Sequence, residues 1–153
     1  MKIKVKLISF VFFIISSVSA GDVEDIKKQI FENNRYANEK NISASEYSKY
    51  GALEFWSSGG LMHEIPARGR PEIYDYMNIK YKNLEVIILE PKKAAVVMYY
   101  SEGSMKPKNA PAVNHYLTRV TQALVKESGE WKVRASHWSP IVGGSGTSQA
   151  STE

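Results

Sequence analysis

The sequence predicts an α+β fold, in which a cone-shaped, curved antiparallel sheet wraps around an N-terminal helix, with two further short helices. Two observations lead to this class. Apolar residues of the first segment recur with the 3.6-residue period of a helix, whereas the segments after Asn78 are apolar runs separated by turns. Helices followed by an antiparallel meander are typical of α+β layers, and a sheet that curves around a helix leaves a cavity suited to a small molecule.

The first helix is expected to start at Asp22, whose side chain can cap free backbone N–H groups of the first turn. Apolar residues at helical spacing would form one stripe that faces the sheet. The stripe consists of Val23, Ile26, Ile30 and Ala37, and Phe31 widens it.

The two short helices are predicted from local signals of helix ends. Ser43 and Glu46 have the spacing of a capping box, which predicts a helix that Gly51 ends. Pro71 suits the first turn of a helix and predicts a further short one. A strand over residues 52–57 is expected between them.

Four strands are predicted in the second half of the chain, where β-branched and aromatic residues fill segments bounded by turn residues. A turn at 90–92 and a hairpin at 127–130 would make neighbouring strands antiparallel. Glycine and serine residues indicate a flexible tail over 143–153, so that the folded domain spans 21–142. The strands are expected at 84–89, 93–103, 113–126 and 131–139.

Residues 1–20 are expected to be a secretory signal peptide. Lysines near the start precede an uncharged run over 7–18, and Val18-Ser19-Ala20 places small residues before a cleavage site after Ala20. The run is shorter than the roughly 20 apolar residues that a membrane span needs. The hypothesis is therefore a periplasmic or secreted protein with no membrane attachment after cleavage.

Charge and cysteine content exclude several classes of partner. Lysine and arginine number 20 against 16 acidic residues, but three of the lysines belong to the leader, so the remaining chain is close to neutral. Nucleic acid and acidic membranes are therefore poor partners. The chain has no cysteine, which excludes disulfides and thiolate metal sites. Histidine spacing fits no metal site, and no nucleotide fingerprint is present, so neither metal nor cofactor is predicted.

The order of elements and four C-terminal motifs resemble the nuclear-transport-factor-2-like superfamily, also called SnoaL-like, over roughly 22–142. The last strands are also similar to the association domain of calcium/calmodulin-dependent protein kinase II. The resemblance implies the cone-shaped fold, a homodimer, and an arginine at position 119 that projects into the pocket. The motifs are Tyr99-Tyr100-Ser101-Glu102-Gly103, Thr118-Arg119-Val120, Gly129-x-Trp131-Lys132-Val133 and Ser136-His137-Trp138-Ser139.

Glu102 is a candidate general base. It lies in phase with Met98 and Tyr100 on an apolar strand, and a carboxylate held between aromatic rings would have a raised pKa. The alternative is a solvated carboxylate at the end of the strand, beside Gly103.

Arg119 is the expected polar anchor of the pocket and shares a strand face with His115, the second candidate base. A guanidinium among apolar neighbours needs an anionic partner. That partner is either a ligand carboxylate or Glu102 in a structural salt bridge.

His137 and Trp138 complete the predicted ligand-binding residues. Because they are adjacent in a strand, one faces the core and the other faces out. His137 follows Trp131, Val133 and Ala135 in phase, and a histidine there is either a pocket group or a hydrogen-bonded core residue. The predicted binding set is Tyr100, Glu102, His115, Arg119, His137 and Trp138.

Three functions remain open from the sequence. The leading one is an exported domain that binds a small, partly apolar ligand in the cone. The second is a cofactor-free isomerase, dehydratase or cyclase with Glu102 or His115 as base. The third is an assembly domain. Apolar residues on both faces of 113–126 predict a homodimer, because the helices can cover only one face.

Overall fold

The computed structural model describes residues 3–148, and the side chains of residues 21–148. Its described part contains one helix, α1 (Ile3–Lys40), and one six-stranded sheet in the order β2-β1-β6-β5-β4-β3. Neighbouring strands are antiparallel except β1 and β6, which are parallel. The strands are β1 (Ala52–Phe55), β2 (His63–Ile65), β3 (Tyr74–Glu90), β4 (Ala94–Pro107), β5 (Val113–Glu127) and β6 (Glu130–Pro140).

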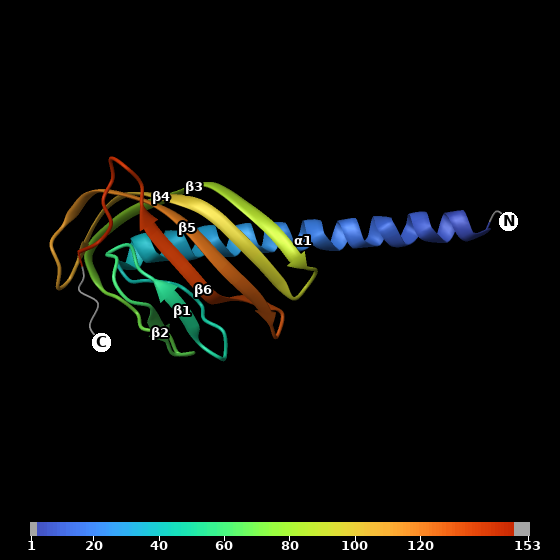
Figure 1. Ribbon diagram of the computed structural model, residues 1–153, viewed down its shortest axis with the longest axis horizontal. Coiled ribbons are helices and arrows are strands. Elements are labelled where there is room, and N and C mark those ends of the chain that lie inside the picture. Colours follow the sequence, from blue (N-terminus) through green and yellow to red (C-terminus); the bar gives the residue numbers. More distant parts are fainter. Residues whose placement is uncertain (1–2, 149–153) are drawn as a thin grey trace.

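The sheet is curved and open, and α1 lies along its inner, concave face, while the N-terminal part of α1 runs beyond the sheet (Figure 1). This arrangement confirms the predicted α+β class. The four long strands also pair as expected, and the hairpin closes where Glu127 pairs with Glu130. Positive φ angles at Ser128 and Gly129 fit the tight turn of such a hairpin.

Helix α1 buries the predicted stripe only in part. Ile26, Ile30 and Ala37 are buried against the sheet, whereas Phe31 is exposed. Asn41, directly after the helix, adopts a φ of 53°, a left-handed conformation that commonly ends helices.

The prediction of two further short helices is wrong, because α1 is the only helix among the described residues. Ser43 does not cap a following turn. Its backbone N–H donates to the Glu72 carbonyl at 2.9 Å, and its hydroxyl accepts the Glu72 N–H at 2.8 Å. This reciprocal pair joins the segment after α1 to the segment before β3, and Tyr74, near the predicted third helix, begins β3 instead.

Two of the register shifts in the sheet bear on the site. Gly103 lies at a register shift of β4 with a φ of 152°, and a Cβ there would overlap the carbonyl oxygen of Asn78 on β3. In β6, Arg134 is an extra residue, since Ala123 pairs with Ala135 and Leu124 with Val133. Such bulges bend a strand and reverse which residues face each side.

The core lies between α1 and the inner face. Its buried members come from the helix and from every long strand. They include Ile26, Ile30, Leu84, Val97, Tyr99, Val120, Leu124, Trp131 and Val133.

The segment after β6 returns to the sheet. Ser145 donates its N–H to the His115 carbonyl at 3.0 Å and accepts the Leu117 N–H at 3.1 Å. A Cβ on Gly146 would overlap the Ser57 carbonyl oxygen, so the chain passes close to that residue. The segment expected to be a flexible tail, 143–153, thus makes backbone contacts with the sheet at Ser145, and residues 149–153 lie outside the described residues.

Candidate functional site: a cavity between the helix and the sheet

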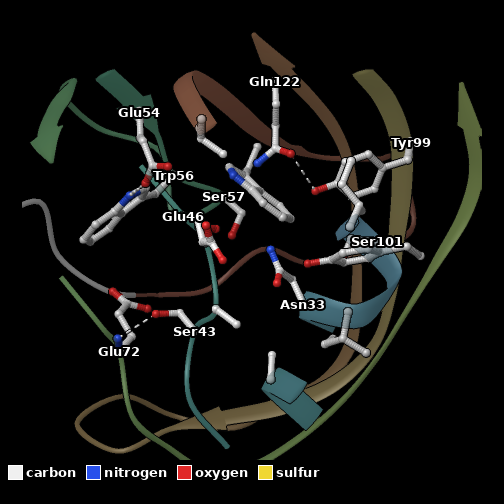
Figure 2. Close-up of a pocket in the computed structure, with 18 of the residues that line it drawn as sticks. Asn33, Ser43, Glu46, Glu54, Trp56, Ser57, Glu72, Tyr99, Ser101 and Gln122 are labelled. Carbon is white, nitrogen blue, oxygen red and sulfur yellow. Dashed lines mark hydrogen bonds between the residues drawn. The ribbon is translucent and has the colours of Figure 1, made fainter. Parts of the chain in front are cut away.

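A cavity of about 170 Å³ lies between α1 and the inner face of the sheet (Figure 2). Strands β3 to β6 contribute to it because alternate residues of a strand point to the same face. Eight of its lining residues are aromatic. The aromatic lining consists of Tyr47, Trp56, Tyr74, Tyr81, Tyr99, Tyr116, Trp131 and Trp138.

The tyrosines act as neutral hydrogen-bond donors. Burial raises the pKa of both Tyr99 and Tyr116, so their hydroxyls stay protonated at neutral pH. The Tyr99 hydroxyl donates to the side-chain oxygen of Gln122 at 3.4 Å, and the Tyr116 hydroxyl donates to the Ser57 hydroxyl at 3.2 Å. Ser57 also accepts the Thr147 N–H at 3.2 Å, which ties the C-terminal segment to the cavity wall.

Glu54 places a carboxylate in this wall with only 6% of the residue exposed. Its position follows from the alternation of β1, in which Ala52 and Glu54 are buried while Leu53 and Phe55 face out. One carboxylate oxygen accepts the indole N–H of Trp56 at 3.0 Å, and the other accepts the Ser136 hydroxyl at 2.8 Å.

The negative charge of Glu54 affects a tyrosine hydroxyl in the cavity wall. Burial raises the pKa of the Tyr47 hydroxyl, and the nearby Glu54 carboxylate raises it further. Burial likewise raises the pKa of Tyr74, followed by the charge of Glu72, whose carboxylate accepts the Tyr74 hydroxyl at 2.9 Å. The wall near these residues is therefore negative.

Two other polar groups in the wall have no hydrogen-bond partner among the described residues. The hydroxyl of Ser101, a residue only 1% exposed, and the indole N–H of Trp131 are buried without a hydrogen bond in the described part of the chain. Asn33 of α1 also lines the cavity. Figure 2 shows Asn33, Ser57, Tyr99 and Ser101 around the same space. A buried polar group without a partner is unfavourable, so this wall is suited to bind a polar group of a ligand.

Comparison with protein-family models, curated proteins and solved structures finds no match. Across the described residues, no helix is long and apolar enough to cross a membrane.

Most of the predicted binding residues lie outside the cavity. Trp138 lines it, whereas the other five are absent from its wall and belong to the outer, convex face of the sheet. These five residues therefore do not line this cavity. The five are Tyr100, Glu102, His115, Arg119 and His137.

Two features explain why these residues face outward although the sequence pattern predicted the inner face. Strand β4 is apolar on both faces, with Val97 and Tyr99 inside and Met98 and Tyr100 outside, so periodicity alone could not choose the inner face. In β6, the extra residue Arg134 shifts the alternation, which turns Trp138 inward and leaves the adjacent His137 exposed.

Glu102 and Arg119 each have another partner on the outer face. Glu102 forms an ion pair with Lys82 across the β3–β4 pairing. The hydrogen bond and charge of Lys82 lower the pKa of Glu102, the opposite of the raised pKa expected of a general base. The Arg119 Nε donates to the Ser139 hydroxyl at 2.9 Å. Because Glu102 pairs with Lys82, the alternative of a structural Arg119–Glu102 salt bridge is not formed.

The sequence interpretation missed the cavity residues Asn33, Glu54, Ser101 and Gln122. A signal for some of them was present. Ser101 and Gln122 are polar residues in phase with the apolar inner positions of β4 and β5, and both are buried. A polar residue on the buried face of a strand is a stronger indication of a site than a charge on the opposite face.

Proposed function

We propose that the cavity between α1 and the sheet binds a small, partly apolar ligand. Aromatic and aliphatic side chains line it together with polar groups that converge on the same space, a composition that suits a small-molecule site. Its volume of about 170 Å³ limits the ligand to a compact molecule of one or two rings, since a cavity of roughly 150 Å³ admits benzene.

The Ser101 hydroxyl carries this proposal. It is fully buried on the cavity wall and has no hydrogen-bond partner in the described part of the chain. Leaving such a group unsatisfied costs about 1–3 kcal/mol. A ligand that forms a hydrogen bond with Ser101 would recover this cost, which would account for a hydroxyl at this buried position.

The test is to identify small molecules released from the purified protein by mass spectrometry. Asn33→Phe should abolish co-purification, because Asn33 faces the cavity and the larger ring would fill it. Glu32→Phe, on the exposed side of the same helix, is the matched control and should retain the molecule. Equal recovery from both variants would overturn the proposal.

Export and family membership are part of the same proposal. The leader pattern supports secretion to the periplasm or beyond, with cleavage after Ala20. A helix along the inner face of a curved sheet, followed by an antiparallel meander, supports a relationship to the nuclear-transport-factor-2-like folds and their cone shape.

Neither of the residues proposed as general base for the enzymatic alternative lies in the cavity. Both Glu102 and His115 lie on the outer face, so neither reaches a molecule held in the cavity. Ligand binding is therefore the function that the geometry supports best.

A separate observation supports assembly as a homodimer. The outer face of the sheet exposes large apolar residues that no element of the described chain covers, and such patches commonly mark interfaces. They are Leu53, Phe55, Ile87, Leu89, Met98 and Tyr100. We propose that a second copy covers this face, which leaves the cavity on the opposite face accessible.

A further inference from the structure

We infer that the ligand is an organic cation, a protonated amine or quaternary ammonium with an apolar body, whose charge lies beside Glu54. The inference rests on the proposed function and specifies its ligand class. It reverses the charge expected from the sequence, where Arg119 predicted an anionic ligand.

The first argument is the balance of charge in the cavity wall. Three glutamates, Glu46, Glu54 and Glu72, line it, and Glu46 is neutralised by its ion pair with Lys132. Arg70 is the one cationic residue among the described lining residues and is itself exposed. An anionic ligand would have to approach these carboxylates, which is electrostatically unfavourable in a partly desolvated site.

The second argument is the surroundings of Glu54. Both of its oxygens accept bonds from neutral donors, Trp56 and Ser136, and no ion pair involves it within the described residues. A buried carboxylate usually has a cationic partner, because neutral donors compensate only part of the lost hydration. A ligand cation in the cavity would supply that partner.

The third argument is the aromatic surface around this carboxylate. Trp56 bonds to Glu54 directly, and Tyr47 lies close enough for the carboxylate to raise its pKa. Aromatic faces attract organic cations, and the attraction is stronger where water is excluded. A carboxylate beside two aromatic rings therefore favours an ammonium group over a neutral hydroxyl.

A separate feature supports a ligand site at this acidic wall. The unpartnered Ser101 hydroxyl lies on β4, and two strands, β6 and β5, separate it from Glu54 on β1. Figure 2 shows the two residues on opposite sides of the same space. Glu54 would bind the cationic group, and Ser101 is available to a polar group elsewhere on the ligand.

The test compares three probes that share a phenyl ring: phenethylamine, 2-phenylethanol and phenylacetate. Titration calorimetry with the purified protein at neutral pH should give an affinity for phenethylamine at least tenfold higher than for 2-phenylethanol. Phenylacetate should bind more weakly than either. This comparison needs no variant, so it does not depend on the folding of a mutant.

A variant that removes the charge of Glu54 tests whether this carboxylate binds the ammonium group. Glu54→Gln keeps the shape of the side chain, and its amide can accept from Trp56 and donate to the Ser136 hydroxyl. It should lower the phenethylamine affinity about tenfold and leave that of 2-phenylethanol unchanged. Glu102→Gln removes the same charge from the outer face and should change neither affinity.

The outcomes separate this inference from the proposed function. Equal or tighter binding of 2-phenylethanol or phenylacetate would overturn the cation and leave ligand binding in place. Equal loss of affinity in Glu54→Gln and Glu102→Gln would overturn the role of Glu54. Failure of all three probes would overturn the cation inference, while the molecules released from wild type and Asn33→Phe decide the proposed function independently.

Discussion

Asn38 of α1 bonds to both backbone groups of Ile79 on β3. Its side-chain oxygen accepts the Ile79 N–H at 2.7 Å, and its side-chain amide donates to the Ile79 carbonyl at 2.7 Å. Strand β3 is the last strand of the sheet, so these groups have no neighbouring strand on that side. The side chain therefore pairs an edge of the sheet and attaches the helix that closes one side of the cavity.

Asn38→Ala should destabilise the protein by about 1–3 kcal/mol, because it leaves the N–H of buried Ile79 without this partner and its carbonyl with only the Asn34 amide. Chemical denaturation measures the change. Arg35→Ala, on an exposed part of the same helix, should stay within about 0.5 kcal/mol of wild type. Equal effects of the two variants would show that the Asn38 contact contributes nothing specific.

A second prediction concerns Asp22 and acid stability. Burial alone would raise the pKa of Asp22, but hydrogen bonds from the Lys126 ammonium at 2.9 Å and the Lys92 N–H at 2.7 Å outweigh it and lower the pKa below 3.8. Since the folded pKa is the lower one, the stabilisation is fully present above 3.8 and is lost as pH falls through the folded pKa.

Asp22→Asn should therefore lower the melting temperature at pH 7, and its difference from wild type should shrink as pH falls below about 3.8. Glu24→Gln removes a charge from the same turn at an exposed position and is the control. A difference between Asp22→Asn and wild type that stays constant down to pH 2 would contradict the ion pair with Lys126.

The fold was predictable where local pattern and tertiary context agree. The hairpin at 127–130 follows from its turn residues, and the paired strands follow from their apolar runs. The helix predicted at Ser43 does not form, because a serine followed by a glutamate at capping-box spacing is only a local signal. In the folded chain the Ser43 hydroxyl bonds to Glu72, far along the sequence, and nothing local encodes that partner.

The site was less predictable than the fold. Choosing the cavity face requires knowing which side of the sheet α1 covers, and β4 is apolar on both sides. The bulge at Arg134 has no clear sequence signal, yet it decides that Trp138 faces the cavity and His137 does not. The charged residues predicted from the sequence to bind a ligand lie on the outer face. The polar groups of the cavity wall include Ser101 and one glutamate in a short strand.

Export predicts a mature chain that starts at Gly21. The following residue, Asp22, bonds to Lys92 and Lys126, so cleavage at this point would leave the first ion pair of the folded domain intact. Intact-mass measurement on exported protein checks the new N-terminus. Recovery of residues 1–20 on a protein held in a membrane fraction would contradict secretion.

The homodimer is predicted to form through the outer face. Light scattering at micromolar concentration should give twice the chain mass, and Met98→Glu should give a monomer, because Met98 is half exposed in the middle of that face. Leu61→Glu places the same charge in the exposed loop between β1 and β2 and should leave the dimer intact. A monomer mass for wild type would contradict the interface.

A crystal structure of the protein grown with phenethylamine, and a second grown with 2-phenylethanol, test the ligand cavity most directly. We expect a bound probe between α1 and the inner face, in contact with the aromatic residues of the wall that include Trp56 and Trp138. We also expect the ammonium group of phenethylamine to lie within hydrogen-bond distance of the Glu54 carboxylate. A cavity that holds neither probe at saturating concentration, or probes bound only on the outer face near Arg119, would contradict ligand binding in this cavity.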